Sequence, residues 1–137
     1  MFRGVKQRGH FDCGIATGAM VFGMAYRDAR GEFRELFPDS GCPINDGMTT
    51  GEMRAWMETT GFNVRVSRPK TVLGTVNERK IYPGRCAVLT WQGPGYNGHW
   101  LMLMNGVAVD PGHHAEPQLP QLTLRRDHNV RAVLWFA

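Results

Sequence analysis

The fold is decided by residues 12–26, which read DCGIATGAMVFGMAY. After Asp12 this stretch is apolar almost all round, which is typical of a helix buried in the centre of a domain. We expect Asp12 to be the N-cap residue, so that Cys13 lies in the first turn, where unpaired backbone N–H groups and the positive end of the helix dipole are exposed. Gly18 and Gly23 weaken a helix intrinsically, so both are expected to allow close packing against it.

Outside this helix, the sequence predicts one more helix and then a series of strands. A capped amphipathic pattern predicts a helix that Gly61 ends, and Asn105-Gly106 is a strong hairpin signal. The predicted helix covers residues 49–58, and the predicted strands cover residues 62–66, 87–91, 100–104, 107–110 and 132–136. Helices followed by antiparallel strands predict an α+β fold, with the N-terminal helix packed on an antiparallel β-sheet.

Length and composition predict a single domain over residues 1–137 and exclude a membrane span. The 137 residues have a mass of 15.4 kDa, which is near the commonest size of one domain. No apolar run approaches the roughly 18 residues that a membrane helix needs, and the N-terminus has no signal-peptide pattern. We therefore expect a cytoplasmic protein, or one that a partner delivers to another compartment.

The net charge and the cysteines further narrow the classes of protein to which the chain could belong. A net charge of +4 and a pI near 9.3 suit acidic partners, but Lys and Arg are scattered along the chain, which does not favour nucleic acid as the main ligand. Three cysteines at wide spacing do not form a disulfide framework or a zinc motif, so no metal and no cofactor is expected. Cys42 and Cys86 are expected to be buried structural thiols. The sequence leaves the oligomeric state open.

A reactive centre is predicted at Cys13, His99 and Asp110. A thiol becomes a useful nucleophile when a helix N-terminus and a nearby imidazolium stabilise its thiolate. The hairpin predicted at residues 105–106 places Asp110 near His99, where a carboxylate can hold the imidazole ring in one orientation. The expected roles are nucleophile for Cys13, general base and acid for His99, and orienting group for Asp110.

These residues also carry a family resemblance. Gln7-x5-Cys13, Asp12-Cys13-Gly14 at the start of a buried helix, Gly98-His99-Trp100 and Val109-Asp110-Pro111 resemble the bacteriocin-processing, double-glycine leader peptidases, which are papain-like cysteine peptidases. The resemblance covers most of the chain, from Gln7 to about Pro111. It implies the same three roles, and it adds Gln7 as the side-chain donor of the oxyanion hole, with the backbone N–H of Cys13 as the other donor.

Two other readings of the same residues stay open. The first is a different acyl transfer on this fold, such as deamidation or transglutamination of a side-chain amide, because Cys, His and Asp in this order serve those reactions too. The second is a catalytically silent papain-like effector or binding module. The sequence favours a peptidase with a peptide or protein substrate, and it assigns no role to His10, His113, His114 or His128.

Overall fold

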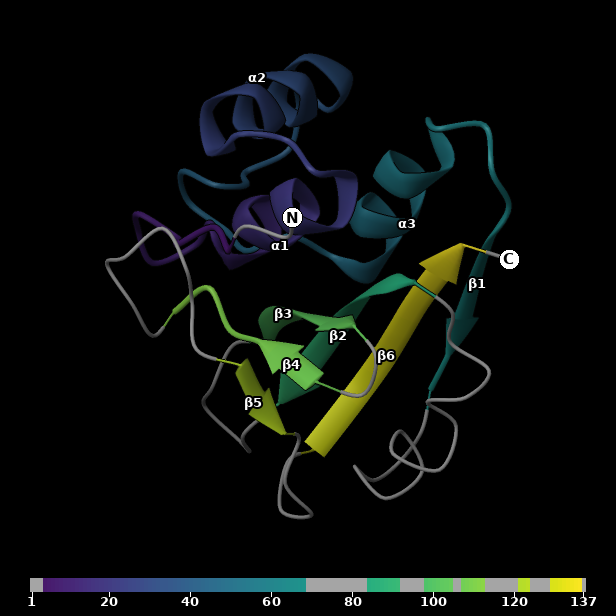
Figure 1. The fold of residues 1–137 in the computed structure, drawn as a ribbon. Helices are drawn as coiled ribbons and strands as arrows, with labels where there is room; N and C mark the ends of the chain where they lie inside the picture. Colours follow the sequence, from purple (N-terminus) through teal and green to yellow (C-terminus); the bar gives the residue numbers. More distant parts are fainter. Residues whose placement is uncertain are drawn as a thin grey trace.

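The computed structural model of the protein describes residues 4–68, 84–91, 98–104, 107–112, 121–123 and 129–136. Within these ranges, three helices lie together on one side of an antiparallel sheet of six strands (Figure 1). The helices are α1 (Cys13–Phe22), α2 (Tyr26–Leu36) and α3 (Thr50–Glu58). The strands are β1 (Val64–Ser67), β2 (Arg85–Trp91), β3 (His99–Met104), β4 (Val107–Val109), β5 (Gln121–Thr123) and β6 (Asn129–Phe136).

The sheet has the order β1-β6-β2-β3-β4-β5, and every neighbouring pair is antiparallel. The last strand, β6, lies between β1 and β2, so the C-terminal end of the chain ties the strand that follows α3 to the rest of the sheet (Figure 1). The centre of the sheet is the pair β2 and β3, in which Thr90 lies opposite His99. This pair carries the face on which α1 packs.

The predicted α+β fold, with an N-terminal helix on an antiparallel sheet, is confirmed, and the differences are local. α2 and β5 are not predicted from the sequence. The strand predicted at residues 62–66 is observed as β1, two residues later at its start, because Gly61, with a φ of 87°, and the two residues after it still belong to the turn. The predicted hairpin turn at residues 105–106 lies outside the described residues, although β3 and β4 pair as that turn requires.

Helix α1 is the centre of the larger core cluster, and its residues 13–21 are all buried. The close packing predicted at Gly18 is confirmed, because a Cβ atom there would lie only 2.2 Å from Cζ3 of Trp56 in α3. The role predicted for Gly23 is wrong. Gly23 is the C-cap residue of α1 and has a left-handed φ of 71°. The N–H of Met24 donates a hydrogen bond to the carbonyl of Ala19, as is common at a helix C-terminus.

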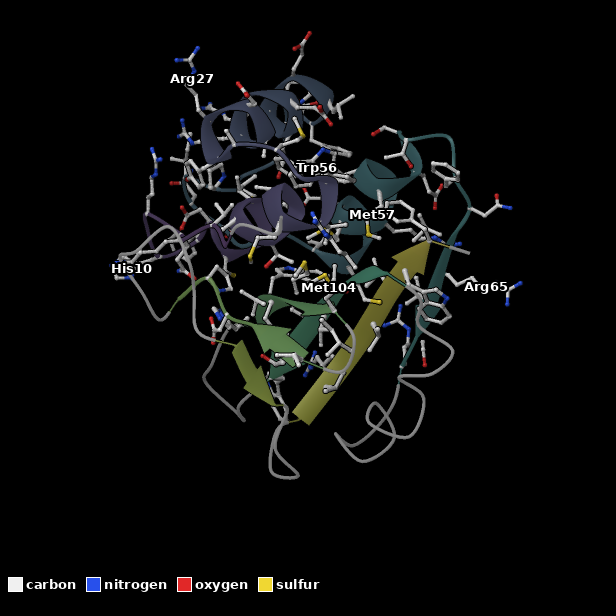
Figure 2. All side chains as sticks on the ribbon, viewed as in Figure 1. His10, Arg27, Trp56, Met57, Arg65 and Met104 are labelled. Atoms are coloured by element: carbon white, nitrogen blue, oxygen red, sulfur yellow. The ribbon has the colours of Figure 1, made fainter. Side chains whose placement is uncertain are left out.

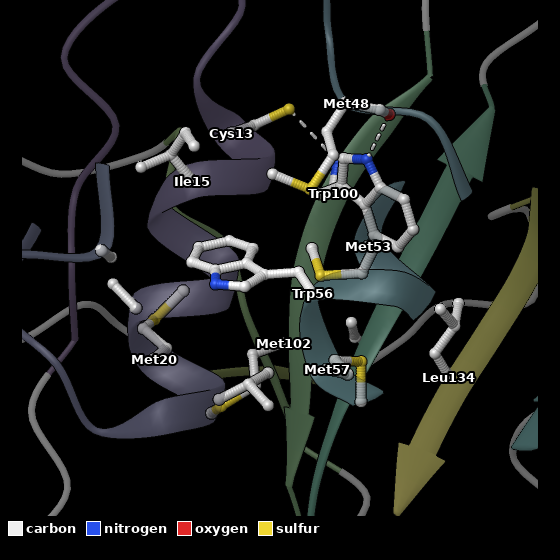
Figure 3. Packing of buried hydrophobic residues seen from close by; sticks show 14 of the residues in the cluster. Cys13, Ile15, Met20, Met48, Met53, Trp56, Met57, Trp100, Met102 and Leu134 are labelled. Atoms are coloured by element: carbon white, nitrogen blue, oxygen red, sulfur yellow. Dashed lines mark hydrogen bonds between the residues drawn. The ribbon is translucent and has the colours of Figure 1, made fainter. Parts of the chain in front are cut away.

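The sheet buries side chains on both faces because successive residues of a strand point to opposite sides. In β3, Trp100 and Met102 face the helices, whereas Leu101 and Leu103 belong to a second cluster. Figure 3 shows Trp100 and Met102 facing α1, together with Trp56 from α3. The helix-facing side therefore holds the residues that surround Cys13. Among the described residues, no helix is long and apolar enough to cross a membrane.

Candidate active site

Cys13 is the first residue of α1, and its thiol is enclosed between that helix and the sheet. Only 5% of the residue is exposed. The backbone N–H of Trp100 in β3 donates a hydrogen bond to Sγ of Cys13 at 3.4 Å (Figure 3). The sulfur therefore accepts a hydrogen bond from the strand that also carries His99, and it lies at the end of α1 where the helix dipole is positive.

The structure brings His99 and Asp110 together as predicted. Nε2 of His99 lies 2.6 Å from Oδ1 of Asp110. The register of β3 and β4 pairs Met102 with Val109, so that Asp110, one residue further, lies diagonally across from His99. The N–H of Gly112 donates a second hydrogen bond to the same Oδ1 at 2.8 Å, which fixes the carboxylate.

His99 also lies close to Cys13, and its ionisation reflects both neighbours. Burial alone would lower the pKa of His99, but its interactions with Asp110 and Cys13 raise it to about 10. Because Asp110 occupies Nε2, Nδ1 is the ring nitrogen that remains for a second partner. Near neutral pH, His99 is therefore a cation.

Gln7 lies beside this pair. Its backbone N–H donates to the carbonyl of Pro111 at 2.9 Å, and its Nε2 donates to the carbonyl of Gly9 at 2.8 Å. A Cβ atom on Gly112 would lie 3.4 Å both from Oε1 of Gln7 and from Cε1 of His99, so the two side chains border the same space. Oε1 of Gln7 is buried without a hydrogen-bond partner. The structure thus brings Gln7 to the edge of the predicted centre.

Asp12 is the N-cap residue of α1 and Cys13 lies in the first turn, as predicted. The side chain of Asp12 nevertheless makes no hydrogen bond to α1. It points back instead, and accepts hydrogen bonds from the N–H of Arg8 at 2.7 Å, the N–H of Gly9 at 2.8 Å and the hydroxyl of Tyr26 at 2.6 Å. Only 3% of Asp12 is exposed. This buried carboxylate holds the loop that carries Gln7 against the start of α1.

Tyr26 is the functional neighbour that sequence reasoning missed. It is the first residue of α2, and the 14 positions that separate it from Asp12 carry no spacing signal in the sequence. Burial, and then its hydrogen bond to Asp12, raise the pKa of Tyr26 above its ordinary value. The hydroxyl therefore stays protonated and continues to donate to Asp12 over the whole neutral range.

Cys42, Cys86 and His10 are the other cysteines and histidine among the described residues. All three cysteines are free and buried, as expected for Cys42 and Cys86. Burial raises the pKa of each of these two thiols to about 12, and for Cys42 the nearby charge of Glu52 adds to the effect. His10 is exposed, and His113, His114 and His128 lie outside the described residues. Among the described residues, no group of three or more His, Cys, Asp or Glu side chains is placed to hold a metal ion.

The chain has an α+β fold in which Cys13 starts a buried helix that packs on an antiparallel sheet carrying His99. Among solved structures it matches the peptidase domain of Streptococcus ComA, a bi-functional ABC transporter involved in a quorum-sensing pathway, with a TM-score of 0.68 and 18% identity. The match covers 100% of this chain and 98% of that domain. It confirms the predicted resemblance at the level of the fold. No protein-family profile and no curated protein matches the chain.

Proposed function

We propose that the protein is a cysteine peptidase that cleaves an amide bond of a peptide or protein substrate. The observation that carries this proposal is the position of His99: its Nε2 lies 2.6 Å from Oδ1 of Asp110, and the next residue, Trp100, donates its N–H to Sγ of Cys13 at 3.4 Å. A nucleophile, a base and an orienting group in contact are the minimum set for covalent acyl transfer. The fold shared with the peptidase domain of ComA supports the same reaction class.

The contacts suggest how the first half of the reaction would proceed. A thiolate on Cys13, paired with the His99 cation, attacks the substrate carbonyl, so that a C–S bond forms and the carbonyl oxygen becomes negative. The backbone N–H of Cys13 and the Nε2 group of Gln7 donate to this oxyanion. The C–N bond then breaks, and His99 gives its proton to the leaving amine.

The second half regenerates the enzyme. With its proton gone, His99 accepts a proton from water, whose oxygen attacks the acyl carbon, and the C–S bond breaks as the acid product forms. Asp110 holds the ring in place through both steps, since its carboxylate is itself fixed by the N–H of Gly112. The products are a free amine and a carboxylic acid.

A hollow of about 630 Å³ lies close to the proposed site. It is lined by Met48 and Glu52 on the helical side and by Leu89 and Gly98, the residue before His99, on the sheet. A Cβ atom at Gly98 would lie 2.7 Å from Cδ1 of Leu89, so glycine allows the close packing beside His99. We expect this hollow to receive part of the substrate peptide.

The first test is iodoacetamide alkylation of each cysteine, read by peptide mass spectrometry in the wild type and in His99→Ala. Cys42 and Cys86 are internal controls, because their pKa values are raised to about 12. We expect Cys13 to react quickly at pH 6 to 7, where an ordinary thiol with a pKa of about 8.5 is mostly protonated. The proposal fails if Cys13 is as slow as the control thiols or indifferent to the loss of His99; a silent binding module would then be favoured.

A second test identifies the reaction. The wild type and Cys13→Ala are incubated with a synthetic peptide library, and the masses of the products are measured by mass spectrometry. Two fragments that appear only with the wild type support peptide cleavage. A gain of about 1 Da on an intact peptide would show deamidation instead, since the acyl-enzyme then forms on a side-chain amide.

A further inference from the structure

Four arginines that are scattered in the sequence face one groove. Arg8 comes from the loop before α1, and Arg27, Arg30 and Arg34 come from α2. They line a hollow of about 590 Å³, in which Glu35 is the one carboxylate among the lining residues. We call these four residues and the hollow the arginine groove. Tertiary structure therefore gathers positive charge that the linear sequence spreads out.

Among the described residues, the four arginines of the groove form no ion pair, and Glu35 is the one carboxylate that lines it. The ion pairs among the described residues are Arg54 with Glu58 and His99 with Asp110, so none involves the groove. Glu32, also on α2, is engaged elsewhere, because its Oε1 accepts the indole N–H of Trp56 at 2.9 Å. Like charges spaced along one helix stripe weaken the helix slightly, and such a violation is typical of a functional surface.

The groove leads to the loop that carries Gln7. The guanidinium of Arg8 lies over the ring of Tyr26, 4.5 Å from its centre, and the hydroxyl of Tyr26 donates to Asp12 next to Cys13. A smaller hollow of about 350 Å³ shares Arg8, Tyr26 and Arg30 with the groove and also reaches Asp12. Figure 2 shows Arg27 on α2 and His10 on this loop projecting to the same side of the molecule.

We propose that the arginine groove binds an acidic segment of the peptide or protein substrate, at a distance from the bond that Cys13 attacks; this inference rests on the proposed peptidase function. Arginine forks bind carboxylates with two parallel hydrogen bonds. Arg30 and Arg34 are four residues apart, a rise of about 6 Å along a helix. Carboxylates on every second residue of an extended peptide are about 7 Å apart, so two of them match this spacing.

The groove chemistry favours a peptide over a nucleic acid. Single-stranded nucleic acid needs exposed aromatic rings on which bases stack. Tyr26 is the aromatic residue that lines the groove, and the guanidinium of Arg8 already lies over its ring. The occupant is therefore expected to supply carboxylates and an extended backbone, not stacked bases.

Fluorescence anisotropy with the Cys13→Ala variant measures this binding without any cleavage. The probe is a labelled peptide of three Glu-Ser repeats, and its neutral match has three Gln-Ser repeats. We expect the neutral peptide to bind at least tenfold more weakly. Arg27→Gln/Arg34→Gln changes two exposed groove residues. This double variant is expected to bind the acidic peptide at least tenfold more weakly than Cys13→Ala alone does. Arg30→Lys, which keeps the charge and removes the fork, is expected to weaken it about threefold.

The matched control is Arg65→Gln/Arg68→Gln, which removes the same charge at two exposed positions at and just after β1. Arg65 lies on the side of the molecule away from Arg27 and His10 (Figure 2). This control is expected to change the affinity less than twofold. An equal loss in the control, or equal binding of both peptides by the wild type, overturns the inference, because net charge alone would explain the binding.

Two further outcomes separate this inference from the proposed function. If a ten-residue oligothymidine binds more tightly than the acidic peptide and needs the same arginines, the groove is a nucleic-acid site and the inference is wrong. If the acidic peptide binds but Cys13 fails the alkylation test, the peptidase proposal fails, and the groove serves a partner and not a substrate. If Cys13 is activated but the acidic peptide does not bind, the inference about the arginine groove is wrong and the peptidase proposal is unaffected.

Discussion

Cys13 and Cys42 lie in the same core cluster and are equally enclosed, with 5% and 2% of each residue exposed, but their surroundings differ. The sulfur of Cys13 accepts the N–H of Trp100 and lies close to His99, whose pKa is raised to about 10. The sulfur of Cys42 lies 3.7 Å from the carbonyl oxygen of Phe11. One thiol therefore faces donors and a cation, and the other faces an acceptor.

This difference suggests a hypothesis: the neighbouring groups, and not burial, separate a candidate nucleophile from a structural thiol. Burial disfavours a thiolate wherever it occurs. At Cys42 the charge of Glu52 adds to that effect, whereas the neighbour of Cys13 is His99, whose own pKa is raised to about 10. Substitutions around the two thiols test whether they differ for this reason.

The largest effect is expected from His99→Ala. This change removes the cation beside Cys13 and the proton donor for the leaving amine, so peptide hydrolysis should fall by about 10³-fold. The rate is measured on the peptide identified by the library digest, and a thermal melt checks the fold. Cys42 should alkylate at the wild-type rate. If hydrolysis falls less than tenfold, His99 does not serve as the acid and base.

Gln7→Ala should give the next largest loss. Removal of one oxyanion donor typically slows turnover by about 10²-fold or more, because that hydrogen bond strengthens in the transition state. Alkylation of Cys13 has no such oxyanion, so its rate should change less than threefold. The ratio of the two rates is therefore the measurement. Equal losses in both would mean that Gln7 only positions the loop beside Asp110.

Asp110→Asn should move the pH profile more than it lowers the maximal rate. The carboxylate helps to raise the pKa of His99 to about 10, so the wild type should lose hydrolysis as the pH rises through that value and His99 gives up its proton. Without the negative charge the pKa of His99 falls, and the alkaline limb should move down by about 1 to 2 pH units. Coincident alkaline limbs in the two proteins would contradict the orienting role.

Cys42→Ala should have the smallest effect on the reaction. Hydrolysis and Cys13 alkylation are expected to stay within twofold of the wild type, because Cys42 makes no contact that the reaction uses. The loss of a buried sulfur should lower the free energy of unfolding by about 1 kcal/mol, measured by urea denaturation. A large loss of activity with little loss of stability would place Cys42 in the reaction after all.

Much of the fold could be predicted, because its main signals are local. The apolar run of α1, the capping box of Thr49 and Glu52 at the start of α3, and the alternation in the strands each lie within about ten residues. α2 was not predicted because its charged residues outnumber its apolar ones, although Ala29 and Phe33, which are buried, stand four residues apart as on one helix face. β5, three residues long, is held by its pairing with β4.

The candidate site, like the fold, could be predicted where its signals are local in the sequence. Cys13, His99 and Asp110 could be named because a helix start and a hairpin fix their backbones locally. The N-cap position predicted for Asp12 is confirmed, but the partners of its carboxylate, which are Arg8, Gly9 and Tyr26, could not be predicted. A side-chain capping hydrogen bond is worth about 1 kcal/mol, and three hydrogen bonds to a buried carboxylate outweigh it.

By itself, the sequence determined which residues are candidates for the chemistry and which segments form the central helix and most of the sheet, because these depend on residue type and short-range pattern. Only the tertiary structure decided which polar groups meet. It placed Tyr26 against Asp12, set Gln7 beside His99, and gathered Arg8 with the arginines of α2 into one groove. Such contacts join residues whose spacing along the chain follows no helix or strand periodicity. They form only when the helices pack on one another and on the sheet.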